Sequence, residues 1–256
     1  TVTAGIVSAT HRQTGIISDE TGGYEDFLQT DAAIVTEPTG LHVCRAHRGF
    51  IWYEVTTHGR AAHGSRYDEG IDAIMHMGRF LAKLDELEKE LRRRPPYPLT
   101  GPPSLHASLI EGGREISVYP AQCRLTVERR TVPGEAVEAA TAELQAIIDA
   151  LSAADPTFSA ELQATFDRHP FEVGKDAAIV QTLDAVVSTR LGAGRSHTGA
   201  TFWTDAALTA GAGIETVIIG PSGAGLHSAE EWVDLQSVYD MADILAKTAA
   251  AYCGEV

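Results

Sequence analysis

The stretch from residue 49 to residue 166 constrains the fold most, because its hydrophobic pattern switches between two periods in a regular order. Aromatic and β-branched residues, or apolar–polar alternation, mark four strands, while apolar residues at helical spacing mark two helices. The strands are expected at 50–58, 104–110, 118–128 and 158–166, and the helices at 68–93 and 135–151. The order strand, helix, strand, strand, helix, strand predicts a ferredoxin-like unit that is complete by itself.

The segments on either side of this unit have the pattern of an open α/β sheet. Short apolar strands are expected at 14–19, 31–36 and 214–219, a helical turn or two at 24–29, and helices at 175–191, 205–210 and 234–252. The three strands run into loops that carry Asp19 and Glu20, Glu37, and His227. Open α/β sheets place their binding sites at the carboxyl ends of strands, so we expect these loops to form one site.

We therefore expect two domains. Residues 1–46 and 167–256 form an outer α/β domain, and residues 47–166 are inserted into it as the ferredoxin-like unit. Three strands are few for such an outer domain, since the mean sheet has about 5–6 strands. Either the outer domain is unusually small or part of it is missing from this chain.

The acidic composition argues against two classes of partner. The formal net charge is −15 and the sequence pI is about 5.0, so the chain repels nucleic-acid phosphates and anionic membrane surfaces. No apolar run approaches the ~18 residues of a transmembrane helix. The three cysteines, Cys44, Cys123 and Cys253, are far apart, which argues against a disulfide framework or a thiolate zinc site and favours the cytoplasm.

Six motifs, in their order along the chain, resemble those of the co-catalytic zinc peptidases and amidohydrolases. They are Ser18-Asp19-Glu20, Thr36-Glu37-Pro38-Thr39, Gly59-Arg60-Ala61-Ala62-His63-Gly64-Ser65, Glu128-Arg129-Arg130-Thr131-Val132-Pro133-Gly134, Thr204-Asp205 and Gly225-Leu226-His227-Ser228-Ala229-Glu230-Glu231. This family includes acetylornithine deacetylase, succinyl-diaminopimelate desuccinylase, aminoacylase and carboxypeptidase G. The resemblance implies a three-layer α/β catalytic domain, here partial, with the inserted βαββαβ domain serving as lid and dimerisation domain.

The resemblance also implies a pair of zinc ions in a complete active site, for which cobalt or manganese can substitute. Carried over onto this chain, Glu37 and His227 become metal ligands. Imidazole nitrogen and carboxylate oxygen are ligands that zinc accepts, and a catalytic zinc site keeps one position open for water. Two such ions polarise the scissile carbonyl and lower the pKa of water toward neutrality.

The general base has two possible assignments. The family has two adjacent glutamates where this chain has Asp19-Glu20-Thr21. Glu20 is the base if Thr21 stands in the ligand position; alternatively Glu20 is the ligand and Asp19 is the base. The shorter aspartate would draw the base back by roughly one methylene, which general-base geometry tolerates poorly.

The inserted domain supplies further residues by resemblance. His63 matches the histidine that reaches the site of the partner subunit and stabilises the oxyanion, and Arg130 matches the arginine that holds the substrate carboxylate. Ser117 stands where the family often has a substrate-binding asparagine, and Asp205 is a further candidate substrate contact. The structural alternatives are a turn residue for His63 and a solvated strand-end charge for Arg130.

A His-x-Asp segment and a metal-bridging aspartate, both expected upstream by the resemblance, are not found before Asp19, where His11 is the one histidine. We therefore expect the chain to be part of a longer parent and inactive alone. The predicted parent is a cytoplasmic, homodimeric zinc amidohydrolase that cleaves N-acyl amino acids or small peptides, as deacetylases and desuccinylases do. The alternative is a catalytically inactive relative that acts as a dimerising or ligand-binding scaffold.

Overall fold

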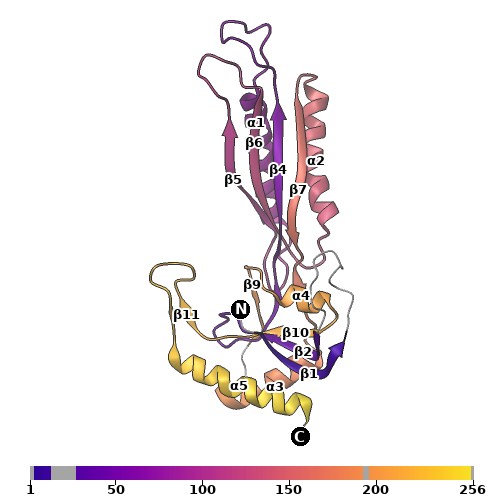
Figure 1. Cartoon of the computed structure of the whole chain (residues 1–256), viewed down its shortest axis with the longest axis vertical. Coiled ribbons are helices and arrows are strands. Elements are labelled where there is room, and N and C mark those ends of the chain that lie inside the picture. Colours follow the sequence, from indigo (N-terminus) through magenta and orange to yellow (C-terminus); the bar gives the residue numbers. More distant parts are fainter. Residues whose placement is uncertain (1–2, 13–26, 193–195, 255–256) are drawn as a thin grey trace. The chain divides into compact units, whose positions relative to one another are not determined.

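The structure is a computed structural model that describes residues 3–12, 27–192 and 196–254 of the 256-residue chain. Its helices and strands form a mixed α/β fold, as predicted (Figure 1). The chain divides into two compact units: unit 1 is Thr1–His47 with Phe171–Val256, and unit 2 is Arg48–Pro170. Each unit has a hydrophobic core of its own.

Unit 2 is a four-stranded antiparallel sheet with two helices. The strands run across the sheet in the order β5 (Ser104–Gly112), β6 (Gln122–Thr131), β4 (Gly49–His58) and β7 (Ser159–Arg168). The helices are α1 (Ala73–Arg93) and α2 (Val137–Ala154), and both pack on the same core. The first and third strands are central and adjacent, which is the ferredoxin-like order, so this prediction is confirmed.

Alternation along β4 decides which side chains meet the helices. Ile51, Tyr53 and Val55 are buried in the core with residues of α1 and α2. The Tyr53 hydroxyl forms a hydrogen bond of 2.9 Å with Thr141 Oγ1 of α2, which satisfies its polar atom. Successive side chains of a strand point to opposite faces, so the odd-numbered positions cover the core and the even-numbered ones form the other face.

Helix α1 begins at Ala73, five residues later than its periodicity predicted, because Asp72 caps it. The Asp72 carboxylate accepts hydrogen bonds from the backbone N–H groups of Ile74 and Met75 at 2.9 and 3.0 Å. A cap of this kind stabilises a helix by about 1 kcal/mol, which outweighs the weak preference of the preceding residues for helix. The helix ends at Arg93, as predicted, before a Pro-Pro pair.

A buried arginine ties β6 to α2. The Arg129 side chain has no exposed surface; its Nη2 donates to Glu135 Oε1 at 2.8 Å and lies 3.4 Å from Glu143 Oε2. Its Nη1 donates to the backbone carbonyl of Arg130 at 2.6 Å. Glu143 in turn pairs with Arg94, just after α1, at 2.6 Å. A guanidinium in the interior requires such partners, because an unpaired buried charge is strongly destabilising.

Unit 1 contains a sheet of six strands within the described residues, where the sequence predicted three. Five run in the order β1 (Thr3–Arg12), β2 (Phe27–Val35), β10 (Glu215–Ile218), β3 (Cys44–His47) and β8 (Phe171–Glu172), and β9 (Thr198–Ala200) pairs with β3. Strands β2 and β10 are parallel neighbours, with Ile34 opposite Val217.

Two expectations for the start of the chain have different outcomes. Residues 27–29, expected in a helical turn, belong to β2, because pairing with β1 extends this strand toward its N-terminus. The strand expected at 14–19 falls outside the described residues, as do Asp19 and Glu20. Tertiary pairing therefore overrode a weak local preference for helix.

The helices of unit 1 are α3 (Ala178–Leu191), α4 (Ala206–Gly211) and α5 (Leu235–Cys253). Helices α3 and α5 share a core with β2 and β10. A short hairpin of β11 (Gly223–Ala224) and β12 (Trp232–Val233) leads into α5, as Figure 1 shows. In the described ranges, every helix is too short or too polar to cross a bilayer.

The three cysteines differ in reactivity. Burial raises the pKa of the Cys44 thiol to about 11, and burial also raises the pKa of Cys123, whereas Cys253 is exposed. The thiolate is the nucleophile, so at pH 8 we expect iodoacetamide to label one site per native chain, Cys253. Mass spectrometry should show one adduct before and three after denaturation; labelling of native Cys44 would contradict this placement.

Candidate functional site

The loops that follow the parallel strands β2 and β10 are hydrogen-bonded to each other. The backbone N–H groups of Gly40 and Leu41 donate to the carbonyl oxygens of Pro221 and Gly220 at 3.2 and 2.8 Å. Thr39 Oγ1 accepts from the N–H of Gly220 at 3.0 Å. The segment that begins at Glu37 is therefore fixed beside the root of the loop that carries His227.

The contact between these loops is so close that only glycine fits at position 220. A Cβ atom there would lie 2.1 Å from the carbonyl oxygen of Glu37. Real side chains do not approach backbone this closely, so the two strand ends could not meet if Gly220 carried a side chain. This glycine sets the position of the Glu37 backbone at the strand end.

Both loops contain backbone that non-glycine residues rarely adopt. Leu41 has φ +59° and His227 has φ +60°, and these are the two non-glycine residues with positive φ in the described ranges. The N–H of Ser228 donates to Gly225 O at 2.8 Å, so His227 is the third residue of a β-turn, a position that with positive φ favours glycine or asparagine. Backbone of this kind concentrates at functional sites.

The donor types at these loops fit a zinc ion, but the described residues do not complete a site. Glu37 is half-buried and His227 is exposed, and carboxylate and imidazole are both zinc ligands. Among the residues that the structure describes, no three His, Cys, Asp or Glu side chains are grouped to hold a metal. Asp19 and Glu20, the predicted base and ligand, lie outside those residues.

His63 and Ser117 lie together in unit 2. His63 forms a β-bridge with Val118, and the N–H of Gly64 donates to Ser117 O at 2.7 Å. His63 Nδ1 accepts from the backbone N–H of Ser65 at 3.2 Å, so Nε2 carries the proton in the neutral ring. His63 is exposed and therefore presents an N–H donor, the group that an oxyanion would need.

Arg130 lies at the other end of the same sheet. It is paired with Phe50, whereas His58, eight residues further along β4, leads into the segment of His63. At about 3.3 Å per residue, these two ends of β4 are about 26 Å apart. Within unit 2, His63 and Arg130 therefore cannot contact the same small molecule.

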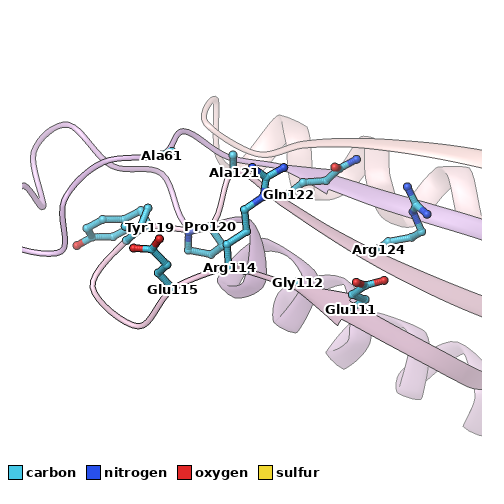
Figure 2. A pocket seen from close by; sticks show the side chains of 12 residues that line it. Ala61, Glu111, Gly112, Arg114, Glu115, Tyr119, Pro120, Ala121, Gln122 and Arg124 are labelled. Atoms are coloured by element: carbon cyan, nitrogen blue, oxygen red, sulfur yellow. The ribbon is translucent and has the colours of Figure 1, made fainter.

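A hollow of about 630 Å³ is lined by residues of the β5–β6 loop and by Ala61 (Figure 2). Glu111 and Arg124 face each other across β5 and β6, and Arg114 and Glu115 come from the loop itself. Charges of both signs line this surface. Asp205, in unit 1, is half-buried at the start of α4, and its side chain does not cap that helix.

The sequence-based reasoning missed one polar cluster in unit 1. Arg45 Nε donates to His197 Nδ1 at 2.8 Å, so the neutral imidazole carries its proton on Nε2 and donates to Asp184 Oδ2 at 2.6 Å. The cluster ties β3, the start of β9 and α3 together. Its members are far apart in the sequence, and a polar composition near residue 197 was the one available signal.

Comparison with known proteins identifies relatives of the chain. The model of the peptidase dimerisation domain of the M20 family matches residues 45–156. Acetylornithine deacetylase of Myxococcus xanthus is 30% identical over 230 residues, which cover 87% of this chain and 58% of that protein. The enzyme of Buchnera aphidicola is 26% identical over 88% of this chain and 58% of its own length. The chain thus spans about 58% of the length of these curated relatives.

Solved structures share the fold. A tripeptidase from Staphylococcus aureus superposes with a TM-score of 0.71 at 17% identity, and an aminopeptidase from Bacillus cereus with 0.69 at 15%. Each match covers 88% of this chain and 58% of the other. At this level of identity the likeness concerns the fold alone.

Proposed function

We propose that this chain, whose residues 45–156 match the peptidase dimerisation domain, is an M20 peptidase or amidohydrolase that hydrolyses an amide bond of N-acyl amino acids or small peptides in a zinc-dependent reaction. The observation that carries the proposal is the pinned pair of loops after β2 and β10, which brings the Glu37 segment to the root of the His227 loop. The curated relatives named above are deacetylases, and deacetylation is hydrolysis of an amide bond.

Glu37 and His227 would hold the metal, together with Glu20 if Asp19 is the base. When bound, the metal polarises the scissile carbonyl and lowers the pKa of water. The carboxylate of Glu20, or of Asp19 in the alternative, takes a proton from the attacking water and returns it to the leaving nitrogen. Proton transfer by a positioned group of this kind contributes about 10²–10⁴-fold to the rate.

In this proposal, four polar side chains contact the substrate. The Nε2–H of His63 donates to the oxygen that becomes negatively charged, and the guanidinium of Arg130 binds a substrate carboxylate. Ser117 and Asp205 contact the polar atoms around the reacting amide. Ser117 is shorter than the asparagine that the family often has there, so its contact reaches less far.

The distance between His63 and Arg130 supports a homodimer. The two ends of β4 beside which these residues lie are about 26 Å apart, too far for one small substrate to bridge. A site that uses both must take His63 from a second copy of the chain. Residues 45–156 match a dimerisation domain, so we propose that unit 2 forms this contact.

The proposal is tested on purified protein that has been stripped with a chelator and titrated with zinc. We expect about two zinc ions per active site and release of free amino acid from N-acetyl amino acids, with cobalt or manganese restoring part of the activity. Magnesium, which prefers oxygen ligands, serves as the negative control. Zinc binding without any amide hydrolysis would contradict the proposed reaction.

A non-catalytic scaffold is the second candidate. It is favoured by the single glutamate of Asp19-Glu20-Thr21, where the family has two adjacent glutamates. On this hypothesis the protein still dimerises and binds small carboxylates, but it takes up no zinc at saturating concentration. The zinc titration therefore separates the two candidates.

A further inference from the structure

Three aromatic side chains form a continuous layer on the face of the unit 2 sheet opposite the helices. The ring centroids of Phe50 and Trp52 are 5.4 Å apart, those of Trp52 and Phe166 are 5.1 Å apart, and those of Phe50 and Phe166 are 6.0 Å apart. Trp52 is 42% exposed and Phe166 is 37% exposed. We call Phe50, Trp52 and Phe166 the aromatic shelf.

The shelf adjoins Arg130, whose orientation is fixed on two sides. The Arg130 guanidinium lies 5.3 Å from the centroid of Phe50, and its Nε donates to Glu128 Oε1 at 2.6 Å. Glu128 also accepts a hydrogen bond of 2.9 Å from Trp52 Nε1. Within the described residues, the two Nη groups of Arg130 have no hydrogen-bond partner, so they present the end-on fork that fits a carboxylate.

Positive charge gathers around the shelf in a protein of net charge −15. The guanidinium of Arg168 lies 4.2 Å from the centroid of Phe166. Burial, and then the positive charge of Arg130, lower the pKa of Arg48 below its usual value, which places two cations close together. An anion bound at Arg130 would relieve this repulsion, whereas an additional cation would increase it.

The aromatic residues are confined to one end of this face. Further along the same strands the outward positions are polar or charged: Glu54, Thr126, Gln163, Arg124 and Glu161. Sheet stability alone would place cross-strand aromatic pairs anywhere along the face. Here they occur only next to the guanidinium groups, at the end where the chain enters and leaves unit 2.

We infer that the aromatic shelf, with Arg130, selects substrates in which the carboxylate belongs to an amino acid with an aromatic or bulky apolar side chain. The inference rests on the proposed function and names its substrate class. The α-carboxylate and the ring of one aromatic residue are a few bonds apart, so Arg130 can bind the first while Trp52 and Phe166 contact the second. A cationic side chain, such as that of ornithine, would meet the positive charge of the arginines.

The test compares N-acetyl-L-phenylalanine, N-acetyl-L-alanine and N-acetyl-L-ornithine. Calorimetric titration of chelator-treated protein measures binding without turnover, and amine release from zinc-loaded protein measures kcat/KM. We expect phenylalanine to be preferred over alanine by about tenfold, which is the size of one aromatic stacking contact, and ornithine to be the poorest ligand.

Substitutions test which residues cause the preference for phenylalanine over alanine. Trp52→Leu and Phe166→Leu should each reduce the phenylalanine-to-alanine ratio by about three- to tenfold. Arg130→Lys, which keeps the charge but loses the fork, should weaken both ligands to a similar extent and leave the ratio unchanged. Tyr239→Ala removes a more exposed aromatic residue from α5 in unit 1 and serves as the control, with ratio and turnover unchanged.

The two proposals fail separately. Binding of N-acetyl-phenylalanine that depends on Trp52 without any hydrolysis supports the shelf and contradicts the proposed reaction. Hydrolysis with a preference for ornithine, or with a ratio that Trp52→Leu and Phe166→Leu do not change, overturns the shelf and leaves the reaction intact. Thermal unfolding of each variant shows whether the sheet has remained folded.

Discussion

Replacing His227 with alanine is expected to reduce amide hydrolysis by more than about a thousandfold. In the proposed site His227 is a metal ligand, and loss of the metal removes both the activation of water and the stabilisation of the oxyanion, each worth about 10² or more. The His227→Ala variant should fold normally, because His227 is exposed and lies in the turn between β11 and β12.

Metal analysis and kinetics of the same preparation check this prediction. The variant should bind less zinc per chain than the parent and should elute as the same oligomer, since the proposed dimer contact lies in unit 2. His169→Ala, which removes an exposed histidine from unit 2, is the matched control and should retain zinc and activity. Unchanged turnover of His227→Ala would exclude this residue as a ligand.

Removing both carboxylates around Arg129 is expected to destabilise unit 2 by about 3 kcal/mol. The double variant Glu135→Gln, Glu143→Gln leaves the fully buried guanidinium of Arg129 without an anionic partner, although a hydrogen-bonding atom remains at each position. Arg94 also loses its contact with Glu143. Urea unfolding should therefore shift to lower concentration with an unchanged slope.

Two further variants separate charge burial from general damage. Adding Arg129→Met to the double variant removes the unpaired charge and should recover at least half of the lost stability, as seen when buried ion pairs are replaced by apolar residues. Glu86→Gln removes an exposed carboxylate that pairs with Lys83 on α1 and should change stability by less than about 0.5 kcal/mol. An unstable triple variant would show that the network is needed for more than charge compensation.

Periodicity predicted the elements of unit 2 because both of their faces are specified locally. Along β7 apolar and polar residues alternate, β4 is rich in aromatic and β-branched residues, and in α1 and α2 the apolar stripe repeats at helical spacing, so each segment contains the information for its own secondary structure. The order of these segments then leaves few topologies, and the observed one is ferredoxin-like. The predicted start of α1 was less accurate, because the position at which this helix begins is set by the capping side chain of Asp72.

The strands of unit 1 were harder to predict from the sequence, because short strands depend on the neighbours with which they pair. Strands such as β8, with two residues, and β9, with three, have no periodicity of their own. They exist because β3 presents unpaired backbone groups on both sides. The cluster of Arg45, His197 and Asp184 escaped notice for the same reason, since its members meet only after β3, β9 and α3 have packed.

The sequence by itself determined the fold class, the inserted unit and the residue types of the candidate site, because these follow from local pattern and from motifs of a few residues. The tertiary structure decided which of those residues meet. It joined the Glu37 loop to Gly220, placed His63 beside Ser117, and put Arg130 at the far end of the sheet next to an aromatic shelf. Such distances depend on strand register and on close backbone contact, which no short stretch of sequence encodes.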